Sequence, residues 1–290
     1  MRIVKKQMKS LSTNFWVFGV LSIFCISALQ AQRKNEIALG INGPVAVLRY
    51  DQIDYTQALD NGIGISLEYG RYLSPYWSLR TGAALQTYTG NAKLNTIEGS
   101  YTTQDSEAET FEFRYQFENY REEQRATYIQ IPVLAQYEGT GQNRFFIAAG
   151  AKIGLLLNSK YKTEAANLST AGYYEQYDAL LEAPRFAGFG DFDPYTWESE
   201  NLALKTSVML SAETGLKLSI TEASAFYLSV YLDYGLNNVF DETQDYLILE
   251  YIAEQEVNFT GNSILSTPFG AVDIVKTISF GFKLKYGFAF

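Results

Sequence analysis

Thr277-Ile278-Ser279-Phe280-Gly281-Phe282-Lys283-Leu284-Lys285-Tyr286-Gly287-Phe288-Ala289-Phe290 closes the chain. Every second residue from Ile278 to Phe290 is large and apolar, and the residues between them are small, polar or basic. A period of two indicates a β-strand whose two faces meet different surroundings. Because the apolar face is continuous and rich in aromatic residues, this stretch predicts a strand that turns one face to lipid.

The same alternation recurs along the chain and predicts about eight strands, at residues 36–50, 62–72, 76–89, 126–138, 144–160, 202–220, 225–240 and 277–290. The first of these is interrupted at Gly43 and Pro44. The connections alternate between short ones, at 73–75, 139–143 and 221–223, and long ones, at 51–61, 90–125, 161–201 and 241–276. Bacterial outer-membrane barrels have this arrangement, with the long loops outside the cell.

We therefore predict an all-β fold: a membrane-spanning, antiparallel, up-and-down β-barrel of about eight strands with long extracellular loops. The alternative is a soluble closed barrel such as a lipocalin, with its apolar face inside. The second face of the predicted strands carries small residues such as Gly64, Ser66 and Gly70. Small residues suit a crowded interior better than a solvated exterior, which favours the membrane barrel.

The first 31 residues have a different character from the rest. Arg2, Lys5, Lys6 and Lys9 precede an uncharged apolar run that ends near Ala31. This pattern predicts a secretory signal peptide at 1–31, because the apolar run is too short to span a membrane as a helix. Residues 32–290 then form one outer-membrane barrel domain, located in the outer membrane of a Gram-negative cell.

The charge of the chain and its cysteine content exclude two features: nucleic-acid binding and disulfides. Lys and Arg number 23 and Asp and Glu 32; without the four basic residues of 1–31, the net charge is 19 − 32 = −13. So acidic a chain repels nucleic acid, so we expect no nucleic-acid partner. The apolar strand faces instead predict that lipid of the outer membrane surrounds the protein. The single cysteine, Cys25, lies in the predicted signal peptide. We therefore expect no disulfide in the mature chain.

One predicted strand carries a family resemblance. It reads Tyr128-Ile129-Gln130-Ile131-Pro132-Val133-Leu134-Ala135-Gln136-Tyr137 and is followed by Phe146-Ile147-Ala148-Ala149-Gly150-Ala151. These residues and the closing run resemble the outer-membrane β-barrel family of Bacteroidota, the PorT-like or "porin family" small barrels. The resemblance covers the whole mature chain and implies the barrel class, in a family used for many tasks. The final aromatic residue, Phe290, resembles the signal by which the barrel-assembly machinery recognises its clients.

The alternation also assigns an inward face. We expect a cross-lumen polar network of Glu68, Arg80, Gln130, Lys152, Lys205, Glu213, Asp233, Lys283 and Lys285, because buried charges must be paired. Counting across the turns places Glu68 opposite Arg80 and Gln130 opposite Lys152. In so small a barrel these residues fill the lumen and make it rigid; the alternative is an ion or proton path, or a gate.

The chain contains no histidine. Barrel hydrolases and acyltransferases use histidine as a general base, and common zinc sites need histidine or cysteine ligands. We therefore predict that the protein is not an enzyme and has no cofactor and no zinc site of the usual kind. Oxygen clusters such as Asp191/Asp193 or Asp241/Glu242/Asp245 could bind calcium, but they lack the regular spacing of a dedicated loop, and a solvated acidic surface is the favoured interpretation.

The long connections are acidic and aromatic. Their candidate contact residues are Tyr173, Tyr174, Tyr177, Trp197, Tyr246 and Tyr251, and residues 110–120 alternate again, which predicts a hairpin above the membrane. Such aromatic residues either contact a partner or pack against one another. Our leading hypothesis is a non-enzymatic outer-membrane barrel whose acidic, aromatic loops contact a protein partner or ligand. The alternatives are a small transport pore, and a component of a secretion or envelope-assembly machine, as the PorT-like resemblance implies.

Overall fold

The computed structural model describes residues 34–50, 62–199, 202–240, 247–253, 257–267 and 274–290, and the segment predicted as a signal peptide lies outside them. Eight long strands form the barrel: β1 (Asn35–Tyr50), β2 (Gly64–Tyr72), β3 (Trp77–Gln104), β4 (Thr110–Glu138), β5 (Asn143–Ala165), β10 (Ser207–Ser219), β11 (Ser224–Gly235) and β14 (Val275–Ala289). In this part of the chain, no helix is long and apolar enough to cross a membrane.

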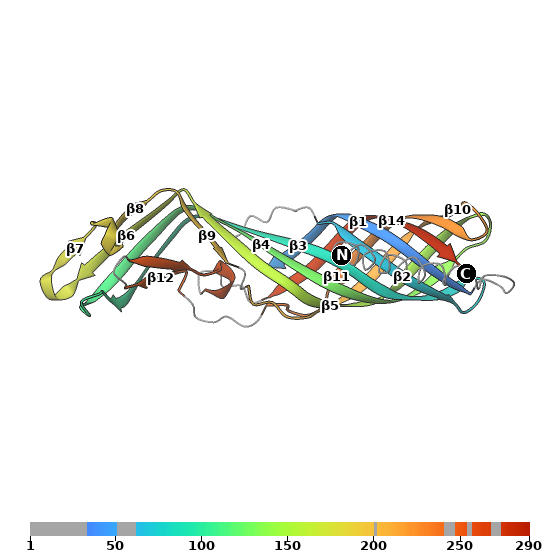
Figure 1. The fold of residues 1–290 in the computed structure, drawn as a ribbon, viewed down its shortest axis with the longest axis horizontal. Helices are drawn as coiled ribbons and strands as arrows, with labels where there is room; N and C mark the ends of the chain where they lie inside the picture. Colours follow the sequence, from blue (N-terminus) through green and yellow to red (C-terminus); the bar gives the residue numbers. More distant parts are fainter. Residues whose placement is uncertain (1–33, 51–61, 200–201, 241–246, 254–256, 268–273) are drawn as a thin grey trace, which may run out of the picture.

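These eight strands close into an antiparallel barrel (Figure 1). Each strand pairs with the next along the chain, and β1 pairs with β14 over its whole length, from Glu36 opposite Ala289 to Tyr50 opposite Val275. Closure leaves the barrel wall without a free edge, which a spanning sheet requires in lipid. The predicted fold class is confirmed.

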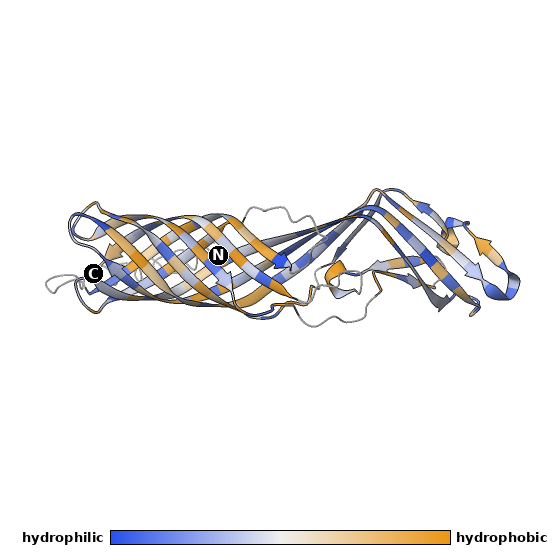
Figure 2. Cartoon of the chain, turned by 180° about the vertical axis from the view of Figure 1, so that it is seen from behind, coloured by the Kyte–Doolittle hydropathy of each residue, from blue (hydrophilic) through white to orange (hydrophobic). Residues whose placement is uncertain are grey.

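The outer wall of the barrel is apolar (Figure 2). The outward residues of every barrel strand include large exposed side chains, such as Leu39, Leu67, Val133, Ile147, Leu210, Leu228 and Phe282. In water, so continuous an apolar surface would be an aggregation site. Lipid is the surrounding that such a surface fits.

Two features of the sequence-based strand assignment are wrong. Strand β1 continues through Gly43 and Pro44, which pair with Phe282 and Gly281, so the predicted interruption does not occur. The register of two hairpins also differs from the predicted one by two residues: Arg80 lies opposite Gly70, and Lys152 lies opposite Pro132. The turns are wider than expected, because Leu73 donates to Trp77 and Gly139 donates to Phe145 through their backbones.

Strands β3, β4 and β5 run far beyond the barrel and form the base of a second region, which we call the arm (residues 90–125, 159–199, 247–253 and 257–267; Figure 1). Most of the connection predicted at 90–125 is therefore not a loop but the continuous hairpin β3–β4. The sequence predicted this hairpin only around residues 110–120. Further elements complete the arm: β6 (Asn167–Tyr174), η1 (Glu175–Tyr177), β7 (Ala179–Leu181), η2 (Arg185–Ala187), β8 (Gly190–Phe192), β9 (Tyr195–Ser199), β12 (Leu249–Ile252), β13 (Asn258–Gly261) and η3 (Ile264–Ser266).

The arm bends away from the barrel at one line of residues across three strands. Asn119 of β4 has a left-handed backbone, with φ of 51°. Asn119 and Asn95 of β3 both lie between the pair of Leu94 with Tyr120 and the pair of Thr96 with Glu118, and the backbone of Glu118 accepts a hydrogen bond from Ala166, between β5 and β6. On β4 the buried residues are even-numbered from Tyr120 onward and odd-numbered from Phe111 to Phe117. The bend therefore exchanges the two faces of the sheet.

Beyond the bend, the arm has its own hydrophobic core. Its members come from β3, β4, β5, β6, the residue before β8 and the segment 247–267, and they include Ile97, Phe111, Phe113, Phe117, Leu168, Phe189, Tyr251, Phe259 and Ile264. The β12–β13 hairpin and η3 cover the aromatic face of β4, where the rings of Phe113 and Tyr251 lie 5.1 Å apart. The arm is thus folded like a water-soluble sheet, with its apolar face inside and its polar face outside.

Candidate functional site

The middle of the barrel lumen holds a four-membered ion cluster. Lys283 lies 2.7 Å from Glu68 and 3.2 Å from Glu213. Lys285 lies 3.1 Å from Glu68 and 2.8 Å from Glu213. All four side chains are buried and come from the inward face of β2, β10 and β14. Two acids and two bases thus neutralise one another across the lumen.

A second ion cluster lies nearer the short turns. Arg80 donates to Glu36 at 2.8 Å and to Glu138 at 3.4 Å. Lys217 lies 2.8 Å from Glu36 and 3.3 Å from Glu138. Arg80 therefore does not pair with Glu68, as the predicted register implied. Glu36, Glu138 and Lys217 were not among the predicted residues, although each falls on the inward face of the same alternation.

The other four predicted lumen residues are an ion pair, a hydrogen-bonded amide and one residue outside the lumen. Lys152 lies 2.8 Å from Asp233, and both are buried. Gln130 donates to the hydroxyl of Tyr88 at 2.6 Å rather than lying opposite Lys152. Lys205 does not point into the lumen: it is exposed and precedes β10, which begins at Ser207. The prediction for Lys205 is wrong because the strand starts later than its alternation suggested.

Among the described residues the buried lumen charges balance. The acids are Glu36, Glu68, Glu138, Glu213 and Asp233, and the bases are Arg80, Lys152, Lys217, Lys283 and Lys285, so the net charge is 5 − 5 = 0. An eight-stranded barrel has an interior just wide enough for side chains. A neutral, side-chain-filled lumen is suited to rigidity and leaves no row of like charges along which an ion of one sign could be selected.

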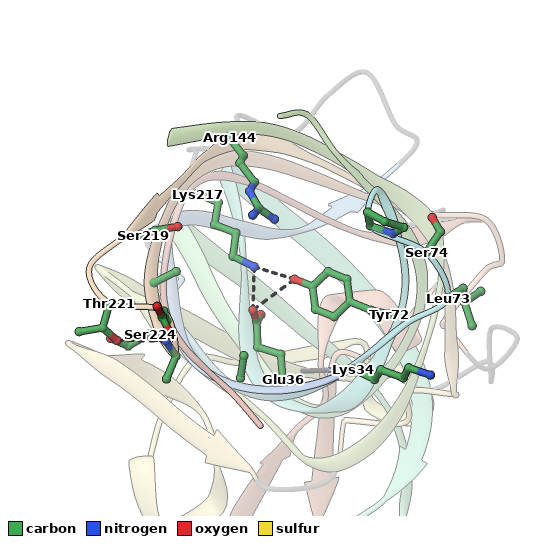
Figure 3. Close-up of a pocket in the computed structure, with 15 residues that line it drawn as sticks. Lys34, Glu36, Tyr72, Leu73, Ser74, Arg144, Lys217, Ser219, Thr221 and Ser224 are labelled. Carbon is green, nitrogen blue, oxygen red and sulfur yellow. Dashed lines mark hydrogen bonds and ion pairs between the residues drawn. The ribbon is translucent and has the colours of Figure 1, made fainter. Parts of the chain in front are cut away.

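The lumen opens into a cavity of about 530 Å³ at the short-turn end. Lys34 and Arg144 lie at its rim (Figure 3). At its inner end Lys217 donates to the hydroxyl of Tyr72 at 2.6 Å and pairs with Glu36 (Figure 3). The cavity thus ends on the second ion cluster.

The predicted loop contact residues divide into buried and exposed ones. Tyr174 and Tyr251 belong to the core of the arm, and the ring of Tyr174 stacks on Phe111 at 5.0 Å. Tyr173 and Trp197 are half-buried, and Tyr246 lies outside the described residues. Tyr177 is 61 % exposed. Packing thus explains Tyr174 and Tyr251, which were predicted as contact residues, and leaves Tyr177 available.

Three exposed apolar residues lie near Tyr177 in the chain and were not among the predicted contact residues. Phe186 is 71 % exposed, and Leu180 and Leu181 are 47 % and 39 % exposed. They belong to η2 and β7, and β7 lies at the far end of the arm from the barrel (Figure 1). We call Tyr177, Leu180, Leu181 and Phe186 the tip residues. Alternation could not identify them, because their segments are too short to show a period.

The segment that covers the arm core is fastened by one buried carboxylate, Glu122 of β4. It accepts hydrogen bonds from Ser263 Oγ at 2.5 Å, the Ile264 backbone N–H at 2.8 Å, Tyr120 at 2.7 Å and Gln124 at 2.6 Å. No described lysine or arginine pairs with it. Burial raises the pKa of Glu122, and these donors oppose that rise.

No group of three or more histidine, cysteine, aspartate or glutamate side chains able to hold a metal occurs in the described parts of the chain. The arm is nevertheless strongly acidic. Its described residues comprise seven basic and sixteen acidic ones, a net charge of 7 − 16 = −9. The arm therefore attracts cationic groups and repels anionic ones.

A closed barrel with an apolar outer wall and a polar lumen defines an outer-membrane β-barrel protein. Residues 30–241 match the family described as outer membrane protein beta-barrel domain, and the chain belongs to that family. None of the curated proteins matches this chain.

Two solved structures are similar to this chain. One is Ail, the attachment invasion locus protein of Yersinia pestis, with 10 % identity, 89 % of this chain and 100 % of that chain covered, and a TM-score of 0.30. The other is OprG of Pseudomonas aeruginosa, with 11 % identity, 89 % and 97 % covered, and a TM-score of 0.35. At these scores the likeness says nothing about the function of this chain.

Proposed function

We propose that this protein is a non-enzymatic outer-membrane barrel whose acidic arm binds a partner or ligand outside the cell. The observation that carries the proposal is the exposure of the tip residues, led by Phe186 and Tyr177, in a region whose surface is otherwise polar and acidic. A water-soluble sheet buries its large apolar side chains. Exposed aromatic residues on a projecting arm are favoured contact residues.

In the part of the chain that the structure describes, the lumen has no features of a catalytic or conducting site, which leaves the arm as the functional region. Its buried acids and bases are paired among the described residues, and it offers neither a catalytic histidine nor a single-sign path. The barrel acts as a membrane anchor that holds the arm away from the lipid. A partner in a secretion or envelope-assembly machine, as the PorT-like resemblance implies, is one class that such an arm serves.

Site-specific photocross-linking in native outer membranes tests the proposal. A photoreactive amino acid replaces Phe186 or Tyr177 in the arm, and Leu39, which is 63 % exposed on the barrel wall, serves as the matched control. We expect adducts of one defined mass from both arm positions and only lipid adducts from Leu39.

If the protein is a pore, we expect no defined adduct at the arm and a steady conductance. If neither arm position forms a defined adduct and the purified barrel shows a steady conductance in planar bilayers, the protein is a channel and the proposal is wrong. A silent bilayer together with defined arm adducts supports a binding arm.

A further inference from the structure

The arm has one long edge, formed by β3. On one side β3 pairs with β4 from Trp77 to Gln104. On the other side β2 pairs with it only as far as Gln86, and β1 meets it once more at Thr89. From Lys93 to Gln104, no described strand pairs along this second side, so β3 is the edge of the arm sheet (Figure 1). Such an edge presents a row of backbone donors and acceptors to an incoming strand.

The edge is only lightly protected. Natural edge strands are blocked by proline, by several lysines, by short length or by a covering element. Between Lys93 and Gln104 the chain has no proline and one lysine, and the bend at Asn95 is followed by an extended run from Thr96. This run is rich in threonine, a residue that favours strands. Its length and composition make it suitable for strand addition.

The hydrophobic core of the arm is open at this edge. Leu94 and Tyr101 of β3 pack against the core but are only half-buried, whereas Phe113 and Phe117 of the neighbouring β4 are fully covered. Ile97 lies between them on the same inner face and is buried. A strand added beside β3 would place every second side chain next to Leu94 and Tyr101. Apolar side chains at those positions would continue the core.

The outer face of the β3 edge is polar and suits basic side chains, not apolar ones. Thr96, Glu98, Ser100 and Thr102 point outward and are exposed. The arm that surrounds them has a net charge of −9 in its described residues. A segment with basic side chains on this face is attracted, and an acidic one is repelled.

We propose that the β3 edge, Lys93–Gln104, binds an extended segment of another protein by adding it as a strand, and that this segment alternates apolar and basic residues. Backbone hydrogen bonds supply the affinity, and the two faces supply the selectivity. This inference rests on the proposed function, since it names the partner chemistry and the surface that the arm uses.

The test uses purified full-length protein in detergent micelles and a synthetic peptide of roughly ten residues, the length of a long strand, alternating valine and lysine. We expect the peptide to bind by fluorescence anisotropy and to slow hydrogen exchange of the backbone amides of Lys93–Gln104. No binding at millimolar peptide overturns the inference, and so does binding that leaves these amides unprotected.

Backbone methylation of the peptide separates strand addition from simple charge attraction. Methylating three alternate peptide nitrogens on one edge should weaken binding about a hundredfold, because each lost hydrogen bond costs about a fivefold factor. Methylating the nitrogens on the opposite edge should leave it unchanged. Equal effects of the two methylations overturn the inference.

Charge reversal on the protein gives the matched test of the surface. Glu98→Lys lies on the edge, whereas Glu164→Lys makes the same charge change on β5, where Glu164 is exposed and pairs with Lys162. We expect Glu98→Lys to weaken peptide binding about threefold, as exposed ion pairs do, and Glu164→Lys to have a smaller effect. Equal effects would mean that only the overall charge of the arm attracts the peptide.

The inference and the proposed function fail in different ways. If arm positions cross-link to a partner in native membranes but the peptide does not protect Lys93–Gln104, the arm binds through another surface and only the inference is lost. If the arm forms no adduct at all, the proposed function is lost as well.

Discussion

The barrel and the arm are built from the same strands with opposite faces inward. On β4, even-numbered residues are buried from Tyr120 to Glu138, while odd-numbered residues are buried from Phe111 to Phe117. From Ile131 to Tyr137 the exposed face is apolar, whereas from Arg121 to Arg125 it is charged although the even-numbered residues are still the buried ones. From Thr110 to Glu118 the exposed face is polar and the buried face is aromatic. A period of two therefore identifies the strand but not its buried face, because the faces exchange at Asn119, after the exposed face has already become charged.

The polar interior of the barrel gives the largest expected effect. Arg80→Gln removes the cation that contacts both Glu36 and Glu138, two carboxylates that are 2 % and 0 % exposed. Leaving such charges under-compensated costs about 3–5 kcal/mol. We expect a lower free energy of unfolding in urea and loss of the compact gel band at a lower temperature.

The control for Arg80 comes from the arm. Lys162→Gln also removes a cation, but its pair with Glu164 is exposed to water. We expect no measurable change in unfolding, because exposed ion pairs contribute little. If both variants lost equal stability, the contrast between a buried polar barrel and a water-exposed arm surface would be wrong.

The second-largest effect is expected from a charged substitution on the outward face of the barrel. Leu39→Arg places a charge on the barrel wall, at a residue that is 63 % exposed. An arginine facing the middle of the bilayer costs about 2–4 kcal/mol. Thr102→Arg, on the exposed outer face of the arm, should cost nothing measurable. Folding of both variants into lipid vesicles measures the difference, and equal tolerance would argue for the soluble barrel.

Glu122→Gln should loosen the segment that covers the arm core. Five donors point at the Glu122 carboxylate, including Thr163 Oγ1 at 3.5 Å, and an amide places its own N–H groups against at least two of them. Unsatisfied buried groups cost about 1–3 kcal/mol. We expect faster hydrogen exchange at residues 263–267 with an unchanged barrel. Glu123→Gln is the control, because the neighbouring Glu123 is half-buried and pairs with Arg125 on the other face of β4. Faster exchange in both variants would contradict the role of Glu122 as the fastening group.

The smallest effect is a dependence on pH with an unusual sign. Burial raises the pKa of Glu122 above its ordinary value of 4.5, so the folded arm binds this proton more tightly than the unfolded chain does. Its contribution to stability is complete below pH 4.5 and declines as the pH rises through the raised pKa.

Acidification from pH 7 toward pH 5 should therefore increase protection at residues 263–267, after correction for intrinsic exchange rates. The Glu122→Gln variant should lack this increase. Equal pH dependence in the two proteins would show that another group is responsible.

Much of the barrel could be predicted from alternation, because each spanning strand meets lipid on one face and a crowded lumen on the other. The closing run at Ile278–Phe290 shows this most clearly, and its inward Lys283 and Lys285 are found in the ion cluster. Register was harder, since alternation is unchanged by a shift of two residues. Arg80 was therefore assigned the wrong partner.

The arm could be predicted only in part. The alternation at 110–120 indicated a hairpin, yet nothing in that pattern shows that the buried face changes at Asn119. Tyr174 and Tyr251 were predicted as contact residues because aromatic residues in long connections have no visible partner in the sequence. Their partners, such as Phe111 and Phe113, lie far away along the chain and meet them only in the fold.

The exchange of faces along β4 is the central claim, and a single-cysteine scan from Thr110 to Tyr137 tests it most directly. The only natural cysteine is Cys25, so in a Cys25→Ser background each introduced thiol reports on one position. In lipid vesicles, we predict that a water-soluble maleimide labels positions 112, 114, 116 and 118, and that a fluorophore at position 131, 133 or 137 is quenched by brominated lipid. Maleimide labelling at 131 and 133, or an unbroken odd–even pattern through Asn119, would contradict it.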